Sequence, residues 1–194
     1  MSIPFVTIVG AGPSGLLLAL LLGKKGIPVK LLEAENALDD RPRASHYSPP
    51  AVYELRRAGV LDDMEAEGGF IPNGACWRKL NGEFLGGVPA PGNSEVNVTP
   101  MICLPLDKLS VILQRQISHL PCVEILYSHK VTTLGQDKGK AWVVVETPDG
   151  TKTLEAKYIV GCDGANSQIR RSLFGDWEFP GFTWDKQIVA TNVC

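Results

Sequence analysis

Phe5-Val6-Thr7-Ile8-Val9 leads directly into Gly10-Ala11-Gly12-Pro13-Ser14-Gly15, and Val29-Lys30-Leu31-Leu32-Glu33 follows after a Leu-rich segment. The order predicts a buried strand, a glycine turn, a helix and a second strand that ends in an acid. Strands separated by a helix in this way pair in parallel, so these residues predict the core of an α/β fold.

Each glycine of the turn has a separate expected task. Gly10 permits the tight turn after the strand, Gly12 allows a pyrophosphate to approach the backbone, and Gly15 lets the helix pack closely. The helix start offers N–H groups and a positive dipole end to phosphates. Glu33 is expected to accept the ribose hydroxyl protons. The pattern predicts a dinucleotide site, with a glycine turn in some other strand–helix–strand unit as the alternative.

Composition and charge narrow the class of protein. The chain has 194 residues, 44% of them hydrophobic and 21% charged, and a net charge of −2. This length suits one domain or slightly more, and this charge gives no reason to expect nucleic acid or an anionic membrane as a partner. The apolar run Leu16–Leu22 is too short to cross a bilayer, and no secretory signal peptide is expected.

The five cysteines are scattered and show no metal-binding spacing. An odd, irregular set argues against a zinc site or a disulfide framework. We therefore expect no bound metal, reduced thiols and a cytoplasmic location.

Other segments show weaker patterns. The first helix is expected from Pro13 or Ser14 to about Lys25, with Gly26 at its end. Further expected elements are a loop over 34–50, a helical stretch over 51–67 interrupted at Gly59, a hairpin over 75–85 with a type I′ turn at Asn81-Gly82, a loop over 86–99, and a helix from Asp107, its candidate cap, to His119.

A β-rich stretch follows. Four segments are expected to form an antiparallel ribbon: Val123–Tyr127, Lys130–Leu134, Ala141–Thr147 and Lys152–Glu155. The next strand, Tyr158–Cys162, is expected to be parallel to the first. It ends at Asp163-Gly164, and a helix is expected near Ser167.

Three segments together resemble one family. These are the glycine turn with Glu33, Arg41-Pro42-Arg43-Ala44-Ser45, and Cys162-Asp163-Gly164-Ala165-Asn166-Ser167-Gln168-Ile169-Arg170. Their order resembles the group A flavoprotein monooxygenases, the single-component aromatic hydroxylases of the para-hydroxybenzoate and phenol hydroxylase type. The Asp-Gly segment is the most discriminating of the three.

The resemblance implies a fold and a domain plan. The fold is α/β, a Rossmann-like FAD-binding domain of the glutathione-reductase type with an inserted antiparallel β-ribbon. The FAD-binding domain is expected over residues 1–175, interrupted by a hairpin and loop around 70–100. Residues 176–194 are expected to begin a substrate domain that this chain leaves incomplete, because the family's second flavin motif finds no match after Gly175.

The resemblance also implies cofactors and contacts. FAD would be reduced by NAD(P)H and would use dioxygen to hydroxylate a small aromatic substrate. No catalytic side chain is assigned. The residues expected to contact the cofactor are Gly10, Gly12, Pro13, Ser14, Gly15, Glu33, Ala34, Arg43, Val131, Asp163 and Gly164. Arg43 would approach the pyrophosphate, and Val131 would lie at the adenine. Ser167 belongs to the Asp-Gly segment, and the alternative for it is a role as a helix cap alone.

Leu106 departs from the family, because many relatives have a flavin-holding glutamine at that point. Two other functions are considered: a non-redox FAD-binding module or scaffold completed by another chain, and an NAD-dependent dehydrogenase, which the Asp-Gly segment disfavours. An unfinished substrate domain would expose apolar strand edges, so a homo-oligomer or a complementing chain is the expected partner.

Overall fold

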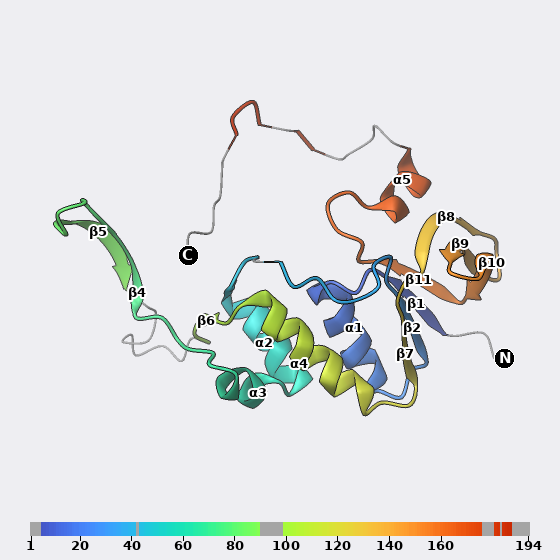
Figure 1. Ribbon diagram of the computed structural model, residues 1–194, viewed down its shortest axis with the longest axis horizontal. Coiled ribbons are helices and arrows are strands. Elements are labelled where there is room, and N and C mark those ends of the chain that lie inside the picture. Colours follow the sequence, from blue (N-terminus) through green and yellow to red (C-terminus); the bar gives the residue numbers. More distant parts are fainter. Residues whose placement is uncertain (1–4, 42, 90–98, 176–180, 183, 188–194) are drawn as a thin grey trace.

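The computed structural model describes residues 5–41, 43–89, 99–175, 181–182 and 184–187. A parallel sheet lies at its centre, with helices on one face and a second, antiparallel sheet on the other (Figure 1). The mixed α/β class predicted from the glycine turn is confirmed.

The central sheet has four parallel strands in the order β11-β1-β2-β7. Their bounds are Tyr158–Gly161 for β11, Val6–Val9 for β1, Val29–Leu32 for β2 and Val123–Leu126 for β7. The prediction for 123–127 was wrong: this segment pairs with β2 and does not join the antiparallel ribbon. All four strands end on the same side, and that side carries the cleft described below.

Helices cover one face of this sheet. They are α1 (Pro13–Gly23), α2 (Pro49–Ala58), α3 (Leu61–Ala66) and α4 (Leu106–Ser118). The expected interruption at Gly59 separates α2 from α3. Asp107 lies in the first turn of α4 but makes no capping hydrogen bond, so its predicted role as the cap was wrong. Lys24 donates from Nζ to the carbonyl of Ala58, which ties the end of α2 to the end of α1.

Alternating side chains of the sheet pack into two separate hydrophobic cores. Ile8 and Leu31 are fully buried against the helices. Val9 and Leu32, one position along each strand, are buried in the second core with Val143 of the antiparallel sheet. Because successive side chains of a strand point to opposite faces, both faces of β1 and β2 are covered and their ends are held in place.

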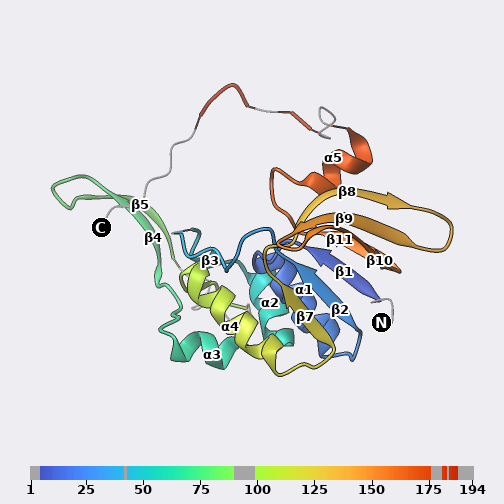
Figure 2. The ribbon, with the colours of Figure 1, turned by 45° about the vertical axis from the view of Figure 1, so that its right-hand side comes forward.

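The second layer is the antiparallel sheet β10-β9-β8. Its strands are β8 (Lys130–Gln136), β9 (Ala141–Thr147) and β10 (Gly150–Ala156), and α5 (Gln168–Phe174) packs on β8. Figure 2 shows this sheet and α5 together, on the opposite side of the parallel sheet from α1.

A hairpin of β4 (Gly74–Arg78) and β5 (Phe84–Pro89) extends away from these layers in both views (Figures 1 and 2). Its existence was predicted, but its type I′ turn was not found. That turn needs positive φ at both central residues, and only Gly82 has it, at +87°. Lys79 instead donates to the carbonyl of Glu83, which leaves a three-residue loop.

A short ladder joins the base of the hairpin region to the helical layer. Strand β3 (His46–Tyr47) pairs with β6 (Ile102–Cys103), within the segment 34–50 that the sequence predicted to be mostly loop. The apolar segment predicted to open a substrate domain, 176–194, lies largely outside the described residues.

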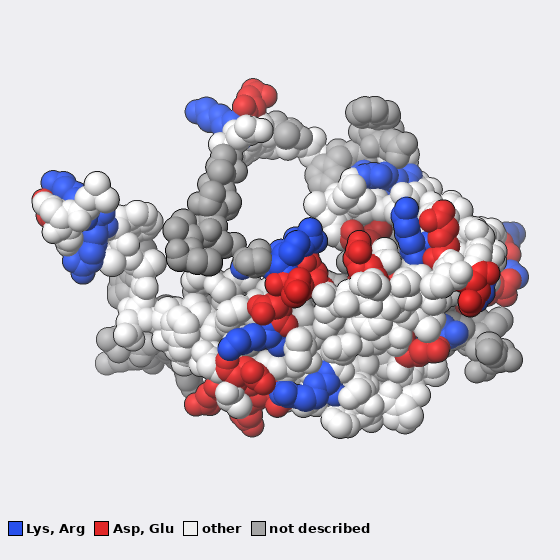
Figure 3. Space-filling view, viewed as in Figure 1, with Lys and Arg blue, Asp and Glu red and all other residues white. Residues whose placement is uncertain are grey.

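No helix within the described ranges is long and apolar enough to cross a membrane. Figure 3 shows acidic and basic side chains interspersed on the visible face, without a broad area of either sign.

Candidate functional site

A cleft of about 830 Å³ lies where β1, β2 and β11 end. The glycine turn, the loop after β2, the start of α4, the start of β8 and the Asp163 corner all line it. Ten of the eleven predicted contact residues line this cleft: Gly10, Gly12, Pro13, Ser14, Glu33, Ala34, Arg43, Val131, Asp163 and Gly164. The carboxyl ends of parallel strands are where open α/β sheets bind ligands.

Gly15, the eleventh residue, supports the cleft without lining it. A Cβ atom at Gly15 would lie 1.9 Å from the carbonyl oxygen of Gly10, so only glycine permits α1 to start this close to the turn. Gly10 has φ +100°, and a Cβ there would lie 2.5 Å from the carbonyl oxygen of Cys162. The glycine turn and the corner formed by Cys162, Asp163 and Gly164 are therefore in direct contact.

Gly12 faces open space. A Cβ atom at Gly12 would meet no atom within 4 Å, although the residue lines the cleft. Gly12 is also the N-cap of α1 and supplies no side-chain cap. The N–H groups of the first helical turn therefore face the cleft without a side-chain acceptor, which is the arrangement that suits a phosphate.

Glu33 links the glycine turn to the loop after β2. Its Oε2 accepts from the backbone N–H of Ala11 at 2.7 Å, and its Oε1 accepts from that of Glu35 at 3.0 Å. Each carboxylate oxygen has a further lone pair, so these bonds orient the group and leave it able to accept hydroxyl protons.

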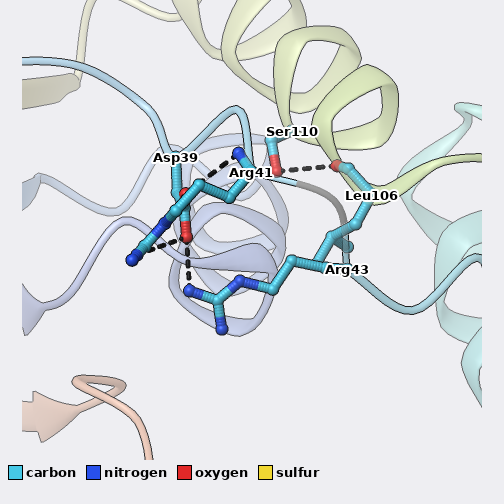
Figure 4. Close-up of polar contacts among 5 residues, drawn as sticks. All are labelled: Asp39, Arg41, Arg43, Leu106 and Ser110. Carbon is cyan, nitrogen blue, oxygen red and sulfur yellow. Dashed lines mark hydrogen bonds and ion pairs between the residues drawn. The ribbon is translucent and has the colours of Figure 1, made fainter. Parts of the chain in front are cut away.

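The loop after β2 that carries Arg41 and Arg43, called the arginine loop here, also contains an acid that the sequence analysis did not single out. Asp39 accepts from Nε and Nη2 of Arg41, at 2.7 and 3.0 Å, and from Nη2 of Arg43 (Figure 4). The two guanidinium groups hold the pKa of Asp39 well below its usual range, with the hydrogen bond from Arg41 as the largest cause. Both arginines and Asp39 line the cleft. The side chains of the two arginines are at least half-exposed.

The first turn of α4 forms another wall. Leu106 lines the cleft where a polar flavin contact was noted as missing. Ser110, one turn further and 6% exposed, also lines it and donates to the Leu106 carbonyl at 3.0 Å (Figure 4). Its hydroxyl oxygen can still accept, so α4 brings a buried polar group to the wall that Leu106 leaves apolar.

The carboxylate of Asp163 is engaged within its own corner. It accepts from the hydroxyl of Ser167 at 2.7 Å and from the backbone N–H groups of Gln168 and Ile169 at 2.6 and 3.1 Å. Ser167 Oγ in turn accepts from the N–H of Arg170, so the reading of Ser167 as a helix cap is confirmed. This network fixes Gly164 at the edge of the cleft.

Several cleft residues were not predicted. Asp39, Ser110 and His129 line it, as does Cys162, whose thiol pKa is raised by burial and by Asp163. Only the position of Cys162 at a strand end could have indicated this from the sequence. His46 and Tyr47, which follow the two arginines, are not in the described lining; His46 is exposed and Tyr47 is buried. No metal-ligating cluster occurs within the described ranges, and the cysteines described there are free.

Comparison with known proteins agrees with this geometry. A family model described as an FAD binding domain matches residues 5–193. The chain is 38% identical over 189 residues to a para-nitrophenol 4-monooxygenase of Pseudomonas sp. (strain WBC-3), covering 97% of this chain and 46% of that protein. It is 31% identical over 179 residues to a probable NADH-specific resorcinol 4-hydroxylase of Rhodococcus jostii (strain RHA1), covering 91% and 34% of the two chains.

The solved structures agree as well. The crystal structure of p-nitrophenol 4-monooxygenase from Pseudomonas putida DLL-E4 superposes with a TM-score of 0.85 at 34% identity, covering 94% of this chain and 46% of that one. The chain thus spans about half the length of the two para-nitrophenol 4-monooxygenases and about a third of the resorcinol 4-hydroxylase. With nearly every residue inside the matching model and the predicted cofactor residues gathered in one cleft, this chain belongs to the FAD-binding domain family of flavin-dependent aromatic monooxygenases.

Proposed function

We propose that this chain is the FAD-binding part of a monooxygenase that uses NAD(P)H and dioxygen to hydroxylate a small phenolic substrate. Bound FAD would supply the redox chemistry, accepting a hydride and activating dioxygen. The observation that carries the proposal is the single cleft that joins the glycine turn, Glu33, the arginine loop and the Asp163 corner. The activities named for the relatives supply the class of substrate.

The residues present suit an adenine dinucleotide. The open position at Gly12 and the uncapped start of α1 would receive the diphosphate, and Arg43 would offset its charge. Glu33 would accept from the adenosine ribose, and Val131 would lie beside the adenine. Because the Asp163 carboxylate is already bonded to α5, we infer that the backbone of Asp163 and Gly164 provides the contact at that corner.

The finer features of the fold form part of the same proposal. We infer that the sheet of β8, β9 and β10 is the inserted antiparallel element of a glutathione-reductase-type FAD domain, with residues 1–175 as that domain and 176–194 as the start of a substrate domain. We also infer a cytoplasmic location, which free cysteines favour.

FAD titration of the purified chain tests the proposal. We expect tight binding with the yellow absorbance of a held flavin, and a loss of affinity of about a hundredfold in Gly12→Val, whose side chain would fill the open position. Gly86→Val is the matched control, because a Cβ at Gly86 on the hairpin also meets nothing within 4 Å. NAD(P)H oxidation stimulated by a phenol would support the hydroxylase, and held flavin without oxidation would support the non-redox module. Failure of the chain to bind FAD would contradict the proposed site.

A further inference from the structure

Asp39 contacts the two arginines of the cleft unequally. It holds Arg41 through the backbone N–H at 3.1 Å, through Nε at 2.7 Å and through Nη2 at 3.0 Å. It contacts Arg43 through Nη2 alone. In Figure 4 the Arg43 side chain extends from beside Leu106 toward Asp39, and the Arg41 side chain runs next to the same carboxylate.

This inequality assigns different tasks to the two arginines. A guanidinium that gives two nitrogens to one carboxylate has its planar fork occupied, whereas a guanidinium bonded through one nitrogen keeps its remaining N–H groups for a second anion. We propose that Asp39 is a positioning residue, which fixes Arg41 as a brace and holds Arg43 over the cleft to receive the diphosphate. The inference rests on the proposed FAD site.

An acid beside two arginines could instead compete with the diphosphate. Its carboxylate stays ionised, since both arginines depress its pKa, so it neutralises one of the two positive charges near the cleft. The side chains are largely exposed, however, at 73% for Arg41 and 50% for Arg43. Charges in such a setting are well screened, so the electrostatic cost of keeping Asp39 is small. Releasing two long side chains would require them to be ordered again when the ligand binds, and this cost is larger.

Two substitutions separate the two roles. Asp39→Ala removes both the charge and the acceptor oxygens, whereas Asp39→Asn removes the charge and keeps one acceptor for Arg41. The probes are ADP, which carries the diphosphate, and adenosine, which lacks it, each titrated by calorimetry. We expect Asp39→Ala to weaken ADP binding by about tenfold and Asp39→Asn to weaken it by less than about threefold. The affinity for adenosine should be unchanged in both variants.

The outcomes are distinct. Equal or tighter ADP binding by Asp39→Ala would overturn the positioning role and indicate a competing anion. Equal losses for ADP and adenosine would also overturn it, because a general structural defect affects both ligands. If the unaltered chain bound neither ADP nor FAD, the proposed cofactor site itself would be wrong. Asp39 lies on an exposed loop outside both cores, so thermal unfolding of the two variants should match that of the parent chain.

Discussion

The glycine turn and the β4–β5 hairpin are both short glycine-containing connections, yet the protein holds them very differently. The glycine turn follows β1, a strand whose two faces are buried in separate cores, and it touches Cys162, the residue after β11. All five residues of β4 are exposed, and the hairpin extends away from the layers (Figure 1). The backbone is therefore held tightly at the cleft and loosely in the hairpin.

The difference also appears in the side chains. Buried residues such as Val9 and Leu32 line the cleft, whereas the hairpin displays Trp77, which is 63% exposed, and Phe84, which is 59% exposed. A monomer seldom leaves such residues grouped in water without a partner. The comparison therefore predicts ligand positioning for the first region and association with a partner for the second.

Alanine at Gly15 should have the largest effect. Its Cβ would overlap the Gly10 carbonyl oxygen, a backbone atom that cannot rotate away, so we expect the free energy of unfolding to fall by about 3 kcal/mol. Gly86→Ala on the hairpin meets no atom within 4 Å and should change it by less than about 0.5 kcal/mol. Chemical denaturation measures both. A small effect at Gly15 would show that the turn is not held as tightly as the comparison states.

ADP should protect one region and not the other. At a concentration a hundredfold above its Kd, a ligand adds about 2.7 kcal/mol of stability to the folded state. We expect hydrogen exchange of the Gly10 and Cys162 amides, which bond to Leu32 and Val9, to slow by up to about a hundredfold.

The matched amide is that of Lys79, which bonds to Glu83 across the hairpin loop. Its exchange should be unchanged by ADP. Equal protection of the hairpin would mean that the two regions open together, and the distinction between them would be lost.

The sequence predicted the cleft better than the hairpin for a physical reason. Gly10 and Gly15 are required by local backbone geometry, which a glycine pattern reports directly. The prediction of a type I′ turn at Asn81-Gly82 was wrong because two alternative loops suit Asn-Gly. The backbone hydrogen bond from Lys79 to Glu83 decides between them. Segment 123–127 was misplaced because an apolar run does not say which strand it will join.

Asp39 was missed for a related reason. An acid two and four residues before arginines is ordinary in a polar loop, and its importance appears only once the loop folds back over the cleft. Asp163 was predicted to contact the cofactor, and the sequence did not indicate that its carboxylate would bind the adjacent start of α5. Local sequence spacing does not report which of two nearby partners a carboxylate will choose.

Thiol labelling should separate the regions by a smaller factor. Cys162 lies in the cleft with its pKa raised by burial and by Asp163, so less of it is thiolate at a given pH; Cys76 lies exposed on β4. We expect Cys162 to react with an aromatic disulfide at least about tenfold more slowly near pH 8, and its rate to keep rising as the pH increases beyond that.

ADP should slow the reaction of Cys162 further and leave that of Cys76 unchanged. Peptide mapping of the labelled chain assigns the sites, and Cys76→Ser removes the faster reaction so that the slower one can be timed. Rapid labelling of Cys162 in the presence of saturating ADP would show that the bound ligand does not shield this thiol.

Polar substitution on the hairpin should have the smallest effect on stability and a clear effect on association. Trp77→Ser and Phe84→Ser remove exposed apolar surface that packs in neither core. The free energies of unfolding and of ADP binding should therefore each change by no more than about 0.5 kcal/mol. We expect the parent chain to self-associate through the hairpin, and sedimentation should show weaker association for both variants. Val111→Ser, on α4 and 52% exposed, is the control for an apolar side chain outside the hairpin. If Val111→Ser reduced association as much as the hairpin variants, exposure alone would explain it, and the hairpin would have no special part in binding a partner.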